Sequence, residues 1–152
     1  MSAQEFNIRI EARNAKQQRV IAGILDGLQR DFPEVNVRIE PESKELVPEE
    51  VVLLVFVTVA SEVLAAVVLG FLDKFWSHLK NKGISPVLSG MDSVQREAEN
   101  YLLNIGIFDF KIIKREDRGL YVFFQFKSKA AVHHLYISRS DMKIIKYERV
   151  AR

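Results

Sequence analysis

The feature that most restricts the fold is a long apolar stretch in the middle of the chain, from Val51 to Leu72. Its length is close to the ~20 apolar residues that a helix needs to cross a bilayer. In that interpretation, basic residues beyond its end would lie on the inner side of the membrane, at Lys74, Lys80 and Lys82. A membrane span over residues 51–72 is therefore one of two alternatives.

The residue types within this stretch favour the other alternative, a buried strand followed by a helix. Its first half is rich in β-branched residues, which prefer extended backbone: Val51, Val52, Val55, Val57, Thr58 and Val59. From Ser61 onward, apolar residues recur every three or four positions and continue past the stretch, at Leu64, Val67, Val68, Phe71, Leu72, Phe75 and Leu79. Glu62 would also be unfavourable in a bilayer without a partner. We therefore expect water-soluble packing to account for the stretch.

The segments before the stretch predict an alternation of strands and a helix. Residues 6–12 and 35–40 alternate apolar and polar side chains, as strands with one wet face do. Between them, Asn14 can cap a helix with one apolar stripe that ends at the Phe32-Pro33 pair. A Glu-rich connector, Pro41–Glu50, leads into the apolar stretch.

We expect residues 1–88 to form one α+β module. Ile84–Leu88 can add a short strand, which Pro86 would confine to a sheet edge. The resulting βαββα(β) order is that of ferredoxin-like, split βαβ domains. In this arrangement the strand Val51–Val59 would lie at the centre of the sheet.

Residues 92–152 predict a second module, a helix followed by an antiparallel meander of three to four strands. Ser89–Asp92 serves as the linker, Asp92 or Ser93 can cap the helix, and Gly106 can end it. The predicted strands alternate in polarity, and a tight-turn sequence separates the first two; they cover residues 108–114, 120–126, 132–138 and 142–150. The fold class is therefore α+β.

The second module resembles the PepSY domain, a small helix-plus-three-strand module. The residues that carry the resemblance are Arg96-Glu97-Ala98-Glu99, the strands Phe108–Lys114 and Leu120–Phe126, and the closing segment Leu135–Ile145 with its tyrosine, acidic turn and short apolar strand. Met142 stands where the family's final turn usually has a glycine, and the family is mostly extracytoplasmic. The resemblance implies a non-catalytic binding or inhibitory module and supplies no site residues.

Composition and sparse ligands argue against several kinds of chemistry. The chain has no cysteine, which excludes disulfides, thiolate metal sites and a cysteine nucleophile. Its 22 basic and 20 acidic residues nearly balance, so the overall field does not favour nucleic acid by itself. The histidines are His78, His133 and His134, and neighbours in a strand point to opposite faces. We expect no metal site.

Motifs for catalysis or cofactors are not recognisable either. No glycine-flanked serine elbow occurs, and the 7 glycines are scattered rather than clustered before a helix. The acidic connector has no evident enclosure that would raise a carboxyl pKa. We therefore expect no catalytic residues and no cofactor, and no small-molecule ligand is evident, although catalytic residues assembled from distant positions leave no local motif.

The remaining candidate is a face of the predicted meander that mixes aromatic and basic groups. This predicted surface consists of Tyr121, Phe123, Lys127, Lys111, Arg118, His134 and Tyr136. Such a face can stack on bases, receive a peptide, or be buried in a dimer or within the same protein. Arg118–Phe126 also resembles the basic-glycine-aromatic strand of an RNA-recognition motif, but with the register shifted by one residue and too short a helix after it.

Together these features favour a small non-catalytic interaction or regulatory protein that binds a protein partner or associates with itself as a homodimer. One alternative is a nucleic-acid-binding protein that uses the predicted surface. Another is a membrane-associated protein that uses residues 51–72. Met1–Glu11 contains no apolar secretory segment, so we expect a cytoplasmic location.

Overall fold

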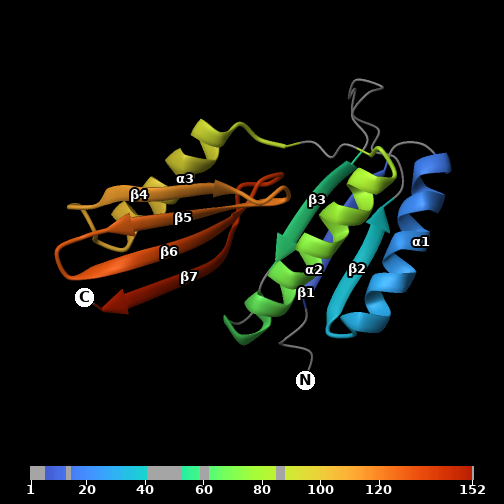
Figure 1. The fold of residues 1–152 in the computed structure, drawn as a ribbon, viewed down its shortest axis with the longest axis horizontal. Helices are drawn as coiled ribbons and strands as arrows, with labels where there is room; N and C mark the ends of the chain where they lie inside the picture. Colours follow the sequence, from blue (N-terminus) through green and yellow to red (C-terminus); the bar gives the residue numbers. More distant parts are fainter. Residues whose placement is uncertain (1–5, 13–14, 41–52, 59–61, 85–87, 152) are drawn as a thin grey trace.

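The computed structural model describes residues 6–12, 15–40, 53–58, 62–84 and 88–151 of the 152-residue chain. The first part contains β1 (Phe6–Ala12), α1 (Ala15–Asp31), β2 (Val35–Glu40), β3 (Leu53–Thr58) and α2 (Glu62–Asn81). Its three-stranded sheet has the order β2-β1-β3, with α1 and α2 side by side against it (Figure 1). The order of elements along the chain is the predicted one.

The order of strands in space differs from a split βαβ arrangement. There, a third strand enters between the two strands that a helix connects, whereas here β1 pairs directly and in parallel with β2. β3 pairs antiparallel with the other edge of β1, so β1 is central and β3 is not. A sheet with one wet face gives its central and edge strands the same period of two, so the pattern does not determine which strand lies in the middle.

The apolar stretch divides into a strand and a helix, as predicted. Residues 53–58 form β3, and the helical period that starts near Ser61 corresponds to α2. Among the helices of the described residues, none combines the length and apolar character that crossing a bilayer requires. The proposed Asn14 cap, the Pro41–Glu50 connector and most of the 84–88 strand lie outside the described residues.

The second part contains α3 (Met91–Asn104) and the strands β4 (Lys111–Asp117), β5 (Tyr121–Lys127), β6 (Ala131–Ser138) and β7 (Ile144–Ala151). The strands form an antiparallel meander in the order β4-β5-β6-β7, and α3 covers one face (Figure 1). The core between them joins helix and strand residues: Val94, Ala98, Leu102, Val122, Phe124, Phe126, Leu135 and Ile137. The predicted helix and meander are therefore confirmed.

Local details of the second part differ from the prediction. Gly90 is the N-cap residue of α3, and no side chain forms a capping hydrogen bond there. Neither Asp92 nor Ser93 is therefore the cap. β4 begins at Lys111 and not at Phe108, whose side chain is 75% exposed. Gly106 has a φ of 89°, as expected where a helix ends. Met142, in the β6–β7 turn, has a φ of 56°, in the left-handed region that favours glycine.

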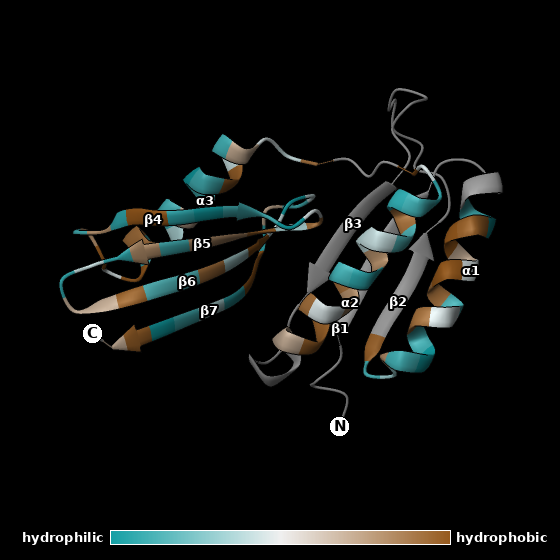
Figure 2. Ribbon diagram, viewed as in Figure 1, coloured by the Kyte–Doolittle hydropathy of each residue, from teal (hydrophilic) through white to brown (hydrophobic). Residues whose placement is uncertain are grey.

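Helix α2 is shared by the two predicted modules. One core contains α1 and α2 together with Leu120, Tyr121 and Ile145 from the second part. Figure 2 shows apolar and polar residues mixed along α1 and α2, as expected of helices that bury only part of their surface. Ser89 also donates a backbone hydrogen bond of 2.7 Å to the carbonyl of Arg139, which ties the predicted linker to the meander. The two parts therefore pack on each other through a continuous apolar contact.

Candidate functional site

The structure brings the predicted surface together on one face of the four-stranded sheet. Strand pairing places Phe123 opposite Tyr136, and Lys111 opposite Lys127. Directly paired residues lie on the same face, as do alternate residues of one strand. The Arg118 guanidinium lies over the Phe123 ring, 5.2 Å from its centroid. The alternation read from the sequence therefore groups these residues correctly.

Two aromatic residues of the predicted surface, Tyr121 and Phe123, are buried. Tyr121 is 1% exposed and belongs to the core that contains α2. Its hydroxyl donates a hydrogen bond of 3.2 Å to Oδ2 of Asp73. Burial raises the pKa of Tyr121, and the Asp73 carboxylate adds to this effect. The side chain is thus occupied by packing within the protein, one of the alternatives for this face.

Phe123 is covered by its neighbours and is 7% exposed. The ring of His134 lies 5.4 Å from it and that of Tyr136 lies 5.0 Å from it, measured between centroids. Arg118 covers it further and donates a hydrogen bond of 2.7 Å to Glu116. The hydrogen bonds from Arg118 and Lys114 lower the pKa of Glu116. Stacking of a base on Phe123 would require these side chains to move.

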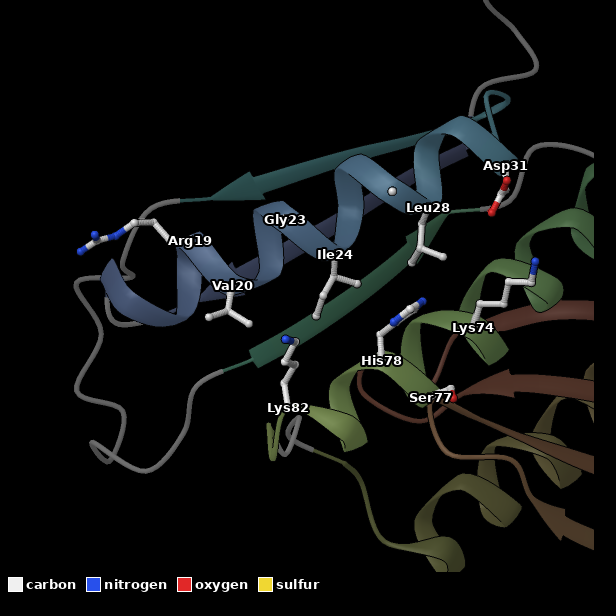
Figure 3. Close-up of a pocket in the computed structure, with 11 residues that line it drawn as sticks. Arg19, Val20, Gly23, Ile24, Leu28, Asp31, Lys74, Ser77, His78 and Lys82 are labelled. Carbon is white, nitrogen blue, oxygen red and sulfur yellow. The ribbon is translucent and has the colours of Figure 1, made fainter.

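A groove between α1 and α2 offers a more open site (Figure 3). It has a volume of about 730 Å³, and none of the residues of the predicted surface line it. One wall is a stripe along α1, and the other is the last part of α2. The residues that line it are Arg19, Val20, Gly23, Ile24, Gly27, Leu28, Asp31, Lys74, Ser77, His78 and Lys82. We call this site the α1–α2 groove.

Two glycines keep the α1 wall of the groove low. A Cβ atom added to Gly23 or Gly27 would meet no atom within 4 Å. Both have ordinary helical φ angles, because the positive-φ glycines of the described residues are others. Glycine inside a helix is less stable than alanine by roughly 0.5–1 kcal/mol. Neither backbone conformation nor internal packing therefore explains these two residues, and they leave helix backbone accessible.

The floor of the groove is aliphatic and its rim is mainly basic. Leu28 is buried, and Val20 and Ile24 are partly buried against the core. Figure 3 shows Lys82 near Val20, beside the first turns of α1, and Lys74 near Asp31 at the other end. The Lys74 ammonium lies 5.4 Å from the centroid of the Phe32 ring. Such a site can hold a ligand that is apolar along its length and negatively charged.

The spacing of Gly23 and Gly27 is a signal for this groove that the sequence contains. These glycines do not precede a helix as those of a phosphate-binding loop do. Two glycines four positions apart lie on the same side of a helix and next to its apolar stripe. That spacing could have indicated an open helix face. The α2 wall could not be found in this way, because it depends on how two helices pack.

The paired histidines point to opposite faces of β6, as predicted. His133 lies on the face covered by α3 and is 1% exposed, whereas His134 lies beside Phe123. Nδ1 of His133 is 2.8 Å from the Tyr147 hydroxyl, and Nε2 is 3.0 Å from Oγ of Ser128. Burial lowers the pKa of His133, with a further contribution from Arg149, while Asp109 acts in the opposite direction. This chain of hydrogen bonds, which is buried at Ser128 and His133 and partly buried at Tyr147, is a structural feature that the sequence did not reveal.

Within the described ranges, no three His, Cys, Asp or Glu side chains are grouped so that they could hold a metal ion. Comparison of the chain with protein-family models, with curated proteins and with solved structures finds no match.

Proposed function

We propose that the protein is a small non-catalytic interaction or regulatory protein, and that it holds a segment of a partner protein in the α1–α2 groove. The observation that carries the proposal is the groove itself. It combines an aliphatic floor, accessible helix backbone at Gly23 and Gly27, and a basic rim. Apolar grooves between helices are a common way of receiving a peptide segment.

The groove-lining groups suit binding better than bond making or breaking. Aliphatic side chains exclude water from a bound apolar surface, and the ammonium groups of Lys74 and Lys82 at the rim orient a charged ligand. Ser77 and His78 are consecutive in α2, so their side chains diverge by about 100° around the helix axis. That geometry does not place a hydroxyl beside a base, as nucleophilic catalysis requires.

Nucleic-acid binding through the predicted surface is the weaker proposal. Lys111 and Lys127 face each other across two strands, which favours an anion between them. Tyr121 and Phe123, however, are buried and do not offer the open aromatic faces on which bases stack. Self-association and the PepSY resemblance stay predictions, and light scattering at high protein concentration would test the first.

Site-specific photo-crosslinking tests the proposed function. p-Benzoylphenylalanine is placed at Ile24 inside the groove, and at Asp26 on another side of α1 as the matched control. We expect a discrete protein adduct in living cells from position 24 and none from position 26.

A groove-filling variant completes this test. Gly27→Leu adds a side chain where there is open space, so it should abolish the adduct while the protein stays folded. Asp26→Leu is the control for added apolar surface on α1. Equal adducts from positions 24 and 26, or an adduct that persists in Gly27→Leu, would contradict the proposal.

A further inference from the structure

We infer that the occupant of the α1–α2 groove is an amphipathic α-helix of about three turns, with acidic side chains at the end that lies beside Lys82. This inference rests on the proposed function and specifies the chemistry of the partner. It is carried by the length of the groove, the accessibility of its walls and the distribution of charge along it.

The length of the groove matches a short helix. Its α1 wall runs from Arg19 to Asp31, which is about 18 Å at 1.5 Å per residue. The lining residues of α1 follow the spacing of one helix face, and those of α2, Lys74, Ser77 and His78, do the same, with Lys82 directly after the end of α2. A helix laid between two such faces can pack its own side chains into both.

The shallow walls favour a helix over a single acyl chain. Gly23, Gly27, Ser77 and His78 are exposed, and Val20 and Ile24 are only partly buried. An acyl chain in such a groove would keep much of its surface in water, whereas sites for small apolar ligands bury most of the ligand. A helix carries its own polar face for the open side. The two glycines allow its backbone to come close to α1, because packing distance depends on the side chains at the contact.

Charge is distributed unevenly along the groove. Lys82 lies at the end where α1 begins, and the acidic lining residue, Asp31, lies at the other end beside Lys74 (Figure 3). A partner helix with acidic residues at one end is therefore attracted most strongly when that end lies beside Lys82. This sets the direction in which the helix lies, as well as its affinity.

Fluorescence anisotropy with synthetic peptides tests this inference on the full chain. The first probe is a fluorescein-labelled amphipathic helix of fourteen residues, with Leu and Ala on one face and Glu at one end. The second probe has Lys in place of each Glu. We expect the Glu peptide to bind the protein and to bind roughly fivefold more weakly to Lys82→Glu, because an attraction becomes a repulsion. The Lys peptide should show the opposite preference.

Matched controls decide the outcome. Lys80→Glu carries the same change of charge at a residue that does not line the groove, and it should bind the Glu peptide as the unchanged protein does. Equal affinity of both peptides, equal weakening by Lys82→Glu and Lys80→Glu, or no binding of the Glu peptide at millimolar protein would overturn the inference. Displacement of the peptide by laurate together with tight laurate binding would replace the helix by an acyl chain.

Failure of this inference can be told apart from failure of the proposed function. The crosslinking experiment at positions 24 and 26 does not depend on what the partner segment looks like. If a position-specific adduct forms and mass spectrometry maps it to a segment that is not helical or not acidic, the function stands and the inference falls. If no position-specific adduct forms, the function falls whatever the peptides do.

Discussion

The indole ring of Trp76 lies directly over the backbone of Gly119. A Cβ atom built on Gly119 would be 2.5 Å from Cδ2 of Trp76, closer than such atoms approach in real proteins. Gly119 also has a φ of 89°, which side chains disfavour. The contact joins α2 to the β4–β5 turn, so it is one of the places where the two parts of the chain pack closely against each other.

Gly119→Ala should therefore lower the free energy of unfolding by about 2–4 kcal/mol, through backbone strain and overpacking together. Gly106→Ala is the matched control, because Gly106 has the same φ of 89° but open space around it. It should cost only the strain, about 1–2 kcal/mol. Urea unfolding measures both values. Equal losses in the two variants would show that the Trp76 contact contributes nothing.

Gly23→Ala and Gly27→Ala should each raise the free energy of unfolding by roughly 0.5–1 kcal/mol, because alanine reduces the entropy of the unfolded chain and the added methyl groups meet no atom. Thermal and urea unfolding would show the change. A loss of stability would mean that the groove is narrower at α1 than the structure shows. If the groove binds a helix, the double variant should be more stable and should bind the Glu peptide more weakly.

His133 should make the stability of the protein depend on pH. Its pKa in the folded protein is lowered from the ordinary value of 6.5, so the unfolded chain takes up a proton first as the pH falls. The contribution to stability is thus present above pH 6.5 and is lost as the pH falls from 6.5 through the folded-state pKa. Measured unfolding free energies should fall over this range, and His133→Gln should flatten the profile.

Tyr121→Phe should lower the free energy of unfolding by about 0.5–1.5 kcal/mol, because it removes the hydrogen bond to Asp73 and keeps the buried ring. A double-mutant cycle with Asp73→Ala isolates that bond from other effects of each substitution. The coupling energy should be close to the loss in Tyr121→Phe alone. A coupling near zero would show that water replaces the partner without loss.

Periodicity predicted the elements of this fold better than their arrangement. The change from β-branched residues to a spacing of three and four near Ser61 correctly divides Val51–Leu72 into β3 and α2. The position of β1 between β2 and β3 was not predictable in the same way. It depends on which segments pair, and the residue pattern of a single strand does not record its partners. The Gly90 cap was missed for a related reason, since Asp92 and Ser93 are stronger caps by residue type alone.

The candidate site was harder to predict than the fold. Alternation correctly groups Phe123, His134 and Tyr136 on one face, but the same alternation occurs whether that face meets water or a helix from elsewhere in the chain. Tyr121 meets Asp73 and α2, a contact that no local pattern in the meander indicates. The α1–α2 groove likewise needs both helices in place before its residues adjoin.

One side of α2 lines the groove through Lys74 and His78, and the same helix contacts the meander through Asp73 and Trp76. A ligand in the groove would therefore contact the helix that packs against the four-stranded sheet. The same packing means that the chain cannot be cut between residues 88 and 91 without exposing apolar surface on both fragments.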